Sequence, residues 1–404
     1  MGNVFAGIKV AEFAAFAAGP GVGKMLANYG AEVVHIESRK RPDGFRVQYP
    51  PYANNEPGLD RSGCFALFND GKMSVTLDLK APGALSLGKR IVAWADVVIE
   101  NFTPGTMERL GLDYGAVKEV NDDVIMLRSC NMGQSGPFAS HPGFGFQLTS
   151  WAGFTNLAGD PGRSPVILYG PYIDFIGVGY GVVAVAAALD YRRRTGEGQM
   201  IDLAQYEAGL QFMAPSILEY GANGRIMQRQ GNRSTRACPH GVYPCRGDDR
   251  WCTISAFDDG EWRRLVDTMG NPPWAVDGRW DTFSGRKAGE DELDGLIGKW
   301  TAGFTAEQLM ERLQAAQVHC CLVSDMADLY VDPQLGHRRF WRRLAHSAMG
   351  DFRYQTPPFI LAGAEATVDK PSPNLGQDNE HFFRDALGLS AEEYDDLVAR
   401  QVIY

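Results

Sequence analysis

The sequence predicts an α/β protein with a parallel sheet and a second, smaller α+β domain. Through the first half of the 404-residue chain, short apolar segments typical of buried strands alternate with helix-like segments. Apolar strands separated by helices form parallel sheets that helices cover on both faces. From about residue 225 the pattern changes to strand, polar turn and strand, followed by helices. These two patterns favour two different folds within one chain.

Apolar runs and their flanking turns place the individual elements in order. The elements of the first half are expected as strands at 8–14, 32–37, 74–79, 96–102 and 124–130, and as helices at 21–31, 82–95 and 106–112. The stretch 40–63, rich in Pro, Asn and Arg, is expected to be a long loop, and such loops often cover a site.

The second half is expected to begin with one or two long helices at 174–224, interrupted by a polar turn at 192–199. A strand–turn–strand unit at 241–257 and helices at 260–270 and 290–315 follow. The chain therefore divides into a large Rossmann-like domain at 1–224, which includes the linker helices, and a small α+β domain at 225–330.

Composition and charge are those of a soluble globular protein, with 45% hydrophobic and 22% charged residues. A net charge of −10 without a basic block argues against nucleic acid or an anionic membrane as the main partner. Seven scattered cysteines without a CxxC pair indicate reduced thiols in the cytoplasm. The sequence contains no metal-binding motif, so no metal site is expected.

A glycine motif, AAGPGVGKM at 17–25, follows the first predicted strand, and Glu37 ends the second. This order resembles the dinucleotide fingerprint, but the spacing of Gly19, Gly21 and Gly23 is G-x-G-x-G rather than G-x-G-x-x-G. A nicotinamide-dependent oxidoreductase is therefore one hypothesis. The other is a glycine turn that packs a helix on the sheet.

The fourth predicted strand ends in Asn101 and Phe102, and Arg109 lies on the helix that follows. Ligands gather at the carboxyl ends of strands in open α/β sheets, and an aromatic ring, an amide and an arginine could hold an adenine and a phosphate. The alternative is that Phe102 belongs to the core and Arg109 to a solvated helix face.

One acid, Asp174, stands near the start of the apolar stretch GPYIDFIGVGYG at 170–181. Its local pattern predicts a helix N-cap, since Asp commonly precedes an apolar helix. A partly desolvated carboxylate at a helix start, flanked by glycines, also suits nucleophilic catalysis. The two interpretations are compatible.

Six segments in fixed order make the chain similar to the family III CoA-transferases, the group of formyl-CoA transferase and carnitine CoA-transferase. The resemblance spans essentially the whole chain. It rests on GIKVAEFAAFAAGPGVGKMLANYGAEVVHIE, LFNDGKMSVTLDLK, ADVVIENFTPGTMERLGLDY, GQSGPF, the Asp174 stretch running into RRRTGEGQMIDLAQYEA, and PNLGQDNEHF.

The resemblance implies that residues 331–404 return to the large domain and that two chains interlock as a dimer. It also implies that Asp174 attacks an acyl-CoA thioester, forming first a mixed anhydride and then an aspartyl-CoA thioester. No permanently bound cofactor is implied, because coenzyme A is a co-substrate. The positions that match the CoA site are Ala18, Arg39, Leu77, Lys80, Asn101, Phe102 and Arg109.

Several positions depart from the family pattern. Ala17 replaces a Gln of formyl-CoA transferase, and Ser38 replaces a phosphate-binding Arg whose contact Arg39 is a candidate to take over. The glycine flap of formyl-CoA transferase is missing, and 231–241 takes its place. These changes argue for a roomier acyl pocket, whose candidate residues are Phe144, Phe146, Gln147, His240 and Tyr243.

The identity of the acids that exchange CoA is inferred from a resemblance to one branch of the family. The N-terminal segment resembles the branch that uses succinyl-CoA to activate aromatic acids such as benzylsuccinate, and some members of that branch pair two unlike subunits. Homodimer and heteromer therefore stay open, as does a non-catalytic CoA-binding subunit. An α-methylacyl-CoA racemase of the same fold is the least favoured alternative, because Phe144 stands where that enzyme needs a His base.

Overall fold

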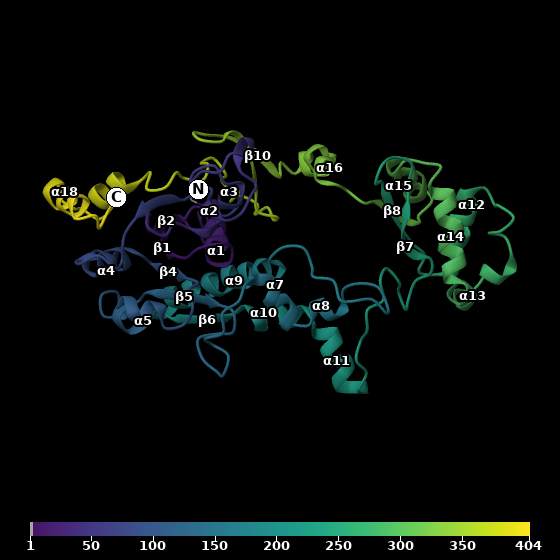
Figure 1. Ribbon diagram of the computed structural model, residues 1–404, viewed down its shortest axis with the longest axis horizontal. Coiled ribbons are helices and arrows are strands. Elements are labelled where there is room, and N and C mark those ends of the chain that lie inside the picture. The colour runs from purple at the N-terminus through teal and green to yellow at the C-terminus, as the bar shows by residue number, and fades with distance from the viewer. Residues whose placement is uncertain (1–2) are drawn as a thin grey trace. The chain divides into compact units, whose positions relative to one another are not determined.

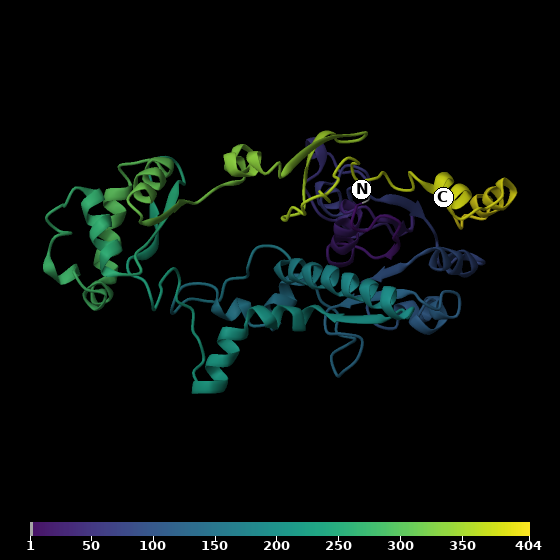
Figure 2. The ribbon, with the colours of Figure 1, turned by 180° about the vertical axis from the view of Figure 1, so that it is seen from behind.

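The computed structural model describes residues 3–404, which divide into two compact units. Unit 1 takes the chain up to Thr155, Ile167–Arg225 and Pro333–Tyr404. Unit 2 takes Asn156–Val166 and Ile226–Asp332. Figure 1 and its reverse view in Figure 2 follow the chain through both units.

Unit 1 is built on a six-stranded parallel sheet in the order β3-β2-β1-β4-β5-β6. The strands are β1 (Lys9–Phe13), β2 (Glu32–Glu37), β3 (Met73–Thr76), β4 (Val97–Glu100), β5 (Ile125–Cys130) and β6 (Met200–Ala204). The order reverses between β1 and β4, which is where open α/β sheets bind ligands. The α/β class and the first five strands are confirmed.

Helices cover both faces of this sheet, as the apolar strands require. Val10 of β1 packs with α1 and α9 on one face, whereas its neighbour Ala11 packs with α4 and the C-terminal segment on the other. The helices of unit 1 are α1 (Ala18–Asn28), α2 (Gly44–Val47), α3 (Gly63–Asn69), α4 (Ala84–Trp94), α5 (Thr106–Leu110), α6 (Tyr114–Lys118), α7 (Gly145–Trp151), α8 (Phe154–Leu157, which runs into unit 2), α9 (Tyr172–Thr195), α10 (Gln205–Phe212), α11 (Ala214–Asn223), α17 (Pro333–His337) and α18 (Ala391–Ala399).

The C-terminal segment packs against the sheet of unit 1. Phe382 and Phe383 are fully buried in the same core as Ala11, and the backbone N–H of Asp78 donates to Val402 O at 2.9 Å. A hairpin of β10 (Trp341–His346) and β11 (Gly350–Gln355) precedes them. Sequence patterns missed this hairpin, because its strands are mostly polar.

The glycine motif lies inside helix α1 rather than in a turn. A Cβ atom built on Gly21 would lie 2.5 Å from Val178 Cγ2, and one built on Gly181 would lie 2.6 Å from Val22 Cγ2. These reciprocal glycines bring α1 and α9 into close contact. A turn that cradles a pyrophosphate is therefore absent from 17–25, and the basis for the nicotinamide hypothesis is lost.

Helix α9 is the one helix among residues 3–404 whose length and hydropathy would allow it to cross a membrane. It packs instead on α1, α7 and α10, and Gly196 at φ 79° ends it. The expected pair of long helices at 174–224 is interrupted by more than a turn, since the edge strand β6 follows α9 directly.

Unit 2 has an antiparallel sheet in the order β7-β8-β9 that packs on helices. Its elements are β7 (His240–Pro244), β8 (Trp251–Ser255), α12 (Asp259–Met269), α13 (Phe283–Ala288), α14 (Glu290–Thr301), α15 (Ala306–Ala315), β9 (His319–Leu322) and α16 (Met326–Val331). A smaller α+β fold is confirmed. The helix expected at 290–315 is two helices, because Thr305 starts a new one with a capping box.

Candidate active site

Asp174 lies in the first turn of α9, as the third residue of the helix. Pro171 takes the N-cap position, so the N-cap expected at Asp174 is wrong. The residue is half-buried, and its carboxylate has no hydrogen-bond partner within residues 3–404. Burial raises the pKa of this carboxyl to about 7. An acid held without a partner in such surroundings is a candidate functional group rather than a structural one.

The start of α7 meets this carboxylate. A Cβ atom built on Gly145, the first residue of α7, would lie 2.7 Å from Asp174 Oδ2. Glycine therefore lets the helix backbone approach the carboxylate. The first N–H groups of a helix have no partner within the helix and carry partial positive charge. This geometry suits an oxyanion that develops beside Asp174.

Two acyl-pocket candidates, Phe144 and Gln147, belong to the same helix start. The Phe144 backbone N–H donates to Gln147 Oε1 at 2.8 Å, so the Gln147 side chain caps α7. The Phe144 ring remains 51% exposed. Phe146, two residues along, is also exposed at 46%.

The other two acyl-pocket candidates, His240 and Tyr243, lie on β7 in unit 2. His240 Nδ1 lies 2.6 Å from Asn232 O. The ring of Tyr243 is buried in the core of unit 2, and its hydroxyl donates to Asp294 at 2.7 Å. The structure gives Tyr243 a packing role.

The seven CoA-site candidates follow the carboxyl ends of four neighbouring strands. Since parallel strands end at one edge of a sheet, the fold brings their backbones to that edge. Their surroundings differ: Ala18 and Leu77 are buried, Asn101 and Phe102 are half-buried, and Arg39, Lys80 and Arg109 are exposed.

Asn101 shapes the loop after β1. Its Nδ2 donates to Ala15 O at 2.7 Å and its Oδ1 accepts from the Ala15 N–H at 2.9 Å. Both polar atoms of the amide are therefore engaged by the protein. The sequence pattern placed Asn101 at a strand end but gave no sign of this clamp.

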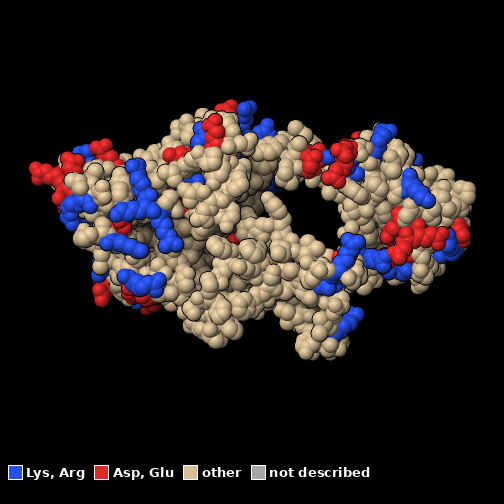
Figure 3. Space-filling model, in the orientation of Figure 1, with Lys and Arg blue, Asp and Glu red and all other residues tan. Residues whose placement is uncertain are grey.

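Basic side chains gather near the same edge of the sheet. Figure 3 shows Lys and Arg over the region of α4, α5 and the C-terminal end of unit 1. Sequence reasoning missed Lys40, which donates to Asp78 Oδ2 at 2.8 Å and lies over the Tyr404 ring. The charge of Lys40 is therefore paired, whereas Arg39, Lys80 and Arg109 present exposed positive charge beside the strand ends.

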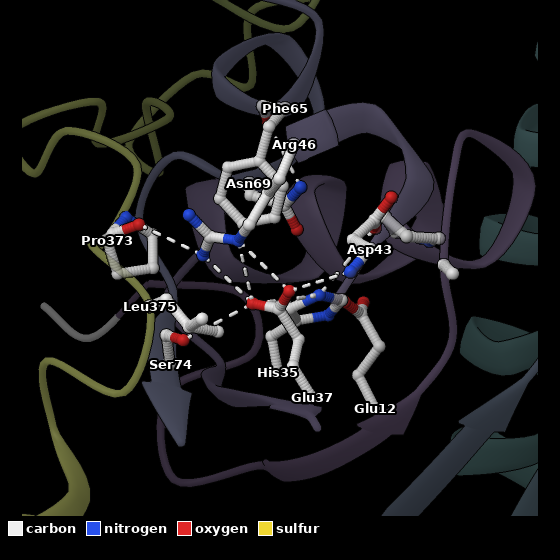
Figure 4. A network of polar contacts seen from close by, with 12 residues as sticks. Glu12, His35, Glu37, Asp43, Arg46, Phe65, Asn69, Ser74, Pro373 and Leu375 are labelled. Atoms are coloured by element: carbon white, nitrogen blue, oxygen red, sulfur yellow. Dashed lines mark hydrogen bonds and ion pairs between the residues drawn. The ribbon is translucent and has the colours of Figure 1, made fainter. Parts of the chain in front are cut away.

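Beneath the loop after β1 lies a buried network of charged side chains (Figure 4). Glu12 accepts from Lys72 Nζ at 2.7 Å and lies 2.7 Å from His35 Nδ1. Glu37 accepts from the guanidinium of Arg46. Burial would raise the pKa of Glu37, but Arg46 and His35 hold it below its usual value.

Asp43 connects this network to the loop. Its two carboxylate oxygens accept from the Phe16 N–H at 3.1 and 3.0 Å, and its own N–H donates to Glu37 Oε1 at 3.0 Å. Burial raises the pKa of Asp43 to about 6. Phe16 stands at φ 63°, a left-handed conformation that is rare for a bulky residue and concentrated at functional sites. Sequence alone carries no signal for this conformation.

Comparisons with known proteins agree with this architecture. The model of CoA-transferase family III matches residues 5–379. The chain is 32% identical over 396 residues to succinyl-CoA–D-citramalate CoA-transferase of Chloroflexus aurantiacus, with 98% of this chain and 97% of that protein covered. It is 27% identical over 395 residues to the BbsE subunit of succinyl-CoA:(R)-benzylsuccinate CoA-transferase of Thauera aromatica, covering 96% and 95%.

A solved structure has the same fold. The CAIB/BAIF family protein from Brucella suis superposes with a TM-score of 0.87 at 29% identity, covering 96% of this chain and all of that one. The family match spans both units and includes Asp174, Gly145 and the strand ends of the sheet. The chain therefore belongs to CoA-transferase family III.

Proposed function

We propose that this CoA-transferase moves CoA from succinyl-CoA to a second carboxylic acid, with Asp174 as the nucleophile. The observation that carries the proposal is the Asp174 carboxylate, unpartnered within residues 3–404 and held against the start of α7. A carboxylate that is poorly solvated and has a pKa about 7 is a stronger nucleophile than an exposed one. Names of relatives support succinyl-CoA as the donor.

The reaction begins when an Asp174 oxygen attacks the thioester carbonyl carbon. The C–S bond breaks, CoA thiolate leaves with the electron pair, and a mixed anhydride of Asp174 and succinate forms. The thiolate then attacks the Asp174 carbonyl carbon, so that succinate leaves and an aspartyl-CoA thioester remains. Backbone N–H groups at the start of α7 would stabilise the oxyanion of each tetrahedral intermediate.

The second half reverses these steps with the acceptor. Its carboxylate attacks the aspartyl thioester and releases CoA thiolate. The thiolate attacks the acceptor's carbonyl carbon in the new anhydride, which frees the acyl-CoA product and regenerates Asp174. Water must be kept out while the anhydride exists, because hydrolysis would destroy it. The aromatic side chains beside Asp174 favour such exclusion.

The exposed basic residues at the sheet edge support the CoA site. Arg39, Lys80 and Arg109 are exposed where the strands end, and they suit the phosphates of CoA. Asn101 would act through the loop it clamps rather than by direct contact. Among acceptors, benzylsuccinate is a candidate because a relative's name includes it.

We also propose that two chains form the active species, as a homodimer or with a related subunit. Helix α11 supports an interface, since none of its residues is buried and Ile217, Leu218 and Tyr220 are each at least half-exposed. A cytoplasmic location is proposed as well, and the seven cysteines, all free, are consistent with it.

The experiment that tests the proposal is isotope exchange between labelled succinate and succinyl-CoA, which needs no acceptor. Purified protein should catalyse exchange, and Asp174→Ala should abolish it. Asp174→Ala that keeps full exchange would exclude the mechanism. A chain that binds CoA but exchanges only after co-expression with a related subunit would instead be the non-catalytic member of a heteromer.

A further inference from the structure

A frame of aromatic ring contacts links the residue after Asp174 to the residue before Gly145. It begins at Phe175, the residue after Asp174, whose ring lies 5.5 Å from that of Phe68. Phe68 stacks on Phe45 at 5.4 Å. The frame continues through Phe16 to Phe144, the residue before Gly145. The two ends of the frame therefore lie next to Asp174 and Gly145 in the chain, and these two residues meet at the Asp174 carboxylate.

Part of the frame is open to a ligand. Phe45 and Phe68 are buried in the core of unit 1, whereas Phe175 and Phe144 are each 51% exposed and Tyr49 is 40% exposed. Phe16 is half-buried and meets Phe45, Tyr49 and Phe144 edge-on at 5.5, 6.2 and 5.8 Å. Edge-to-face contacts of this kind accept another aromatic ring favourably.

Hydrogen bonds and close packing fix the position of Phe16. Its N–H is held by both oxygens of the buried Asp43, and the preceding Ala15 is clamped by Asn101. Gly44 leaves room for the ring, because a Cβ atom there would lie 2.1 Å from Phe16 Cε1. A left-handed backbone at a bulky residue costs free energy, which argues that the ring position serves a purpose.

We infer that Phe16 determines acceptor specificity and that the acceptor is a carboxylic acid with an aromatic ring close to its carboxylate. The carboxylate would meet Asp174 while the ring packs edge-on against Phe16 and Phe144. This inference rests on the proposed function, whose acyl intermediates form at Asp174. It adds the residues that select the acid.

The test compares benzylsuccinate with methylsuccinate, two acceptors that differ by one phenyl ring. Both are assayed with succinyl-CoA as donor, in the wild type and in Phe16→Gly, which removes the ring yet accepts φ 63°. Gly44→Ala displaces the ring without removing it. Phe359→Ala is the matched control, since Phe359 is an exposed ring that stacks on Tyr29 at the opposite end of α1.

The wild type should prefer benzylsuccinate in kcat/KM by about 10- to 100-fold. Phe16→Gly and Gly44→Ala should each reduce that preference at least about tenfold, while methylsuccinate changes by less than about threefold. Phe359→Ala should keep the wild-type preference. Succinate exchange into succinyl-CoA is measured in every variant as the acceptor-independent reaction.

Two results would overturn the inference while leaving the proposed function intact. One is a wild type that exchanges succinate but prefers methylsuccinate. The other is a Phe16→Gly that loses both acceptors and succinate exchange equally, because Phe16 would then support the nucleophile rather than select the acid. Absence of exchange in the wild type, both alone and co-expressed with a related subunit, would instead contradict the proposed function.

Discussion

Replacing Arg46 by Met should destabilise the sheet edge beneath the active site. Arg46 is fully buried, and its Nε and Nη2 donate to Glu37 at 2.9–3.0 Å. Its remaining N–H groups reach Asp60 and two backbone carbonyls. Figure 4 shows this guanidinium between Glu37, Phe65 and Pro373. Arg46→Met leaves Glu37 buried without its cation.

The expected cost follows from these contacts. Breaking a buried ion pair on one side destabilises by about 3–5 kcal/mol, because the other charge stays buried. At about 1.4 kcal/mol per factor of ten, amides of β2 should exchange with solvent about 100- to 5,000-fold faster. Glu37→Gln/Arg46→Met should recover part of this loss, since the unpaired charge is gone.

Hydrogen exchange followed by mass spectrometry on β2 peptides is the suitable assay, because a two-unit chain of this size is not expected to unfold in one step. Arg343→Met is the control: Arg343 pairs with Asp351 on the exposed hairpin β10–β11 and should leave β2 unchanged. Exchange in Arg46→Met within tenfold of wild type, or a double variant worse than the single one, would show that the Glu37–Arg46 pair does not stabilise β2.

Three further predictions concern the site and its scaffold. The rate of succinate exchange should rise about tenfold from pH 6 to 8, because Asp174 with a pKa about 7 must be ionised to attack; a rate that is flat or falls over this range would contradict this. Gly145→Ala should slow succinate exchange at least about tenfold, because the added Cβ crowds Asp174 Oδ2. Gly179→Ala on α9 is the control and should not slow exchange, since a Cβ there meets nothing within 4 Å. Equal effects of the two substitutions would show that Gly145 has no special role at the carboxylate. Gly21→Ala should speed hydrogen exchange in α1 by overpacking that helix on α9, a cost of about 1–3 kcal/mol. Adding Val178→Ala should restore part of the lost stability, and unchanged exchange in α1 would contradict the close contact.

Sequence patterns were sufficient to predict those strands and helices whose secondary structure is determined by their own residues. The first five strands of the chain consist largely of buried residues, and polar turns separate them from the helices, so both could be predicted. Strand β6 could not, because Met200–Ala204 alternates exposed and partly buried residues at an edge and pairs only with β5. The stretch 40–63 was expected to be a loop, yet it holds α2, whose cap Asp43 is buried and accepts from the N–H of Phe16, 27 residues away.

The candidate site likewise contains a residue that could be predicted from the sequence and contacts that could not. Asp174 could be singled out because an acid in an apolar stretch is unusual in sequence. Its contact with Gly145 could not, since 28 residues separate them and only the packing of α7 on α9 joins them. The frame around Phe16 depends on a left-handed backbone and on hydrogen bonds that the Phe16 N–H donates to Asp43, neither of which a residue pattern encodes.

Mass spectrometry of Asp174 during turnover is the direct test of its role as the nucleophile. Protein is incubated with succinyl-CoA and hydroxylamine, digested, and the peptide that contains Asp174 is sequenced by fragmentation. We expect a hydroxamate on Asp174 that depends on succinyl-CoA, with none on Asp190 of the same helix. A chain that exchanges succinate while Asp174 stays unmodified, or that exchanges at full rate as Asp174→Asn, would contradict that role.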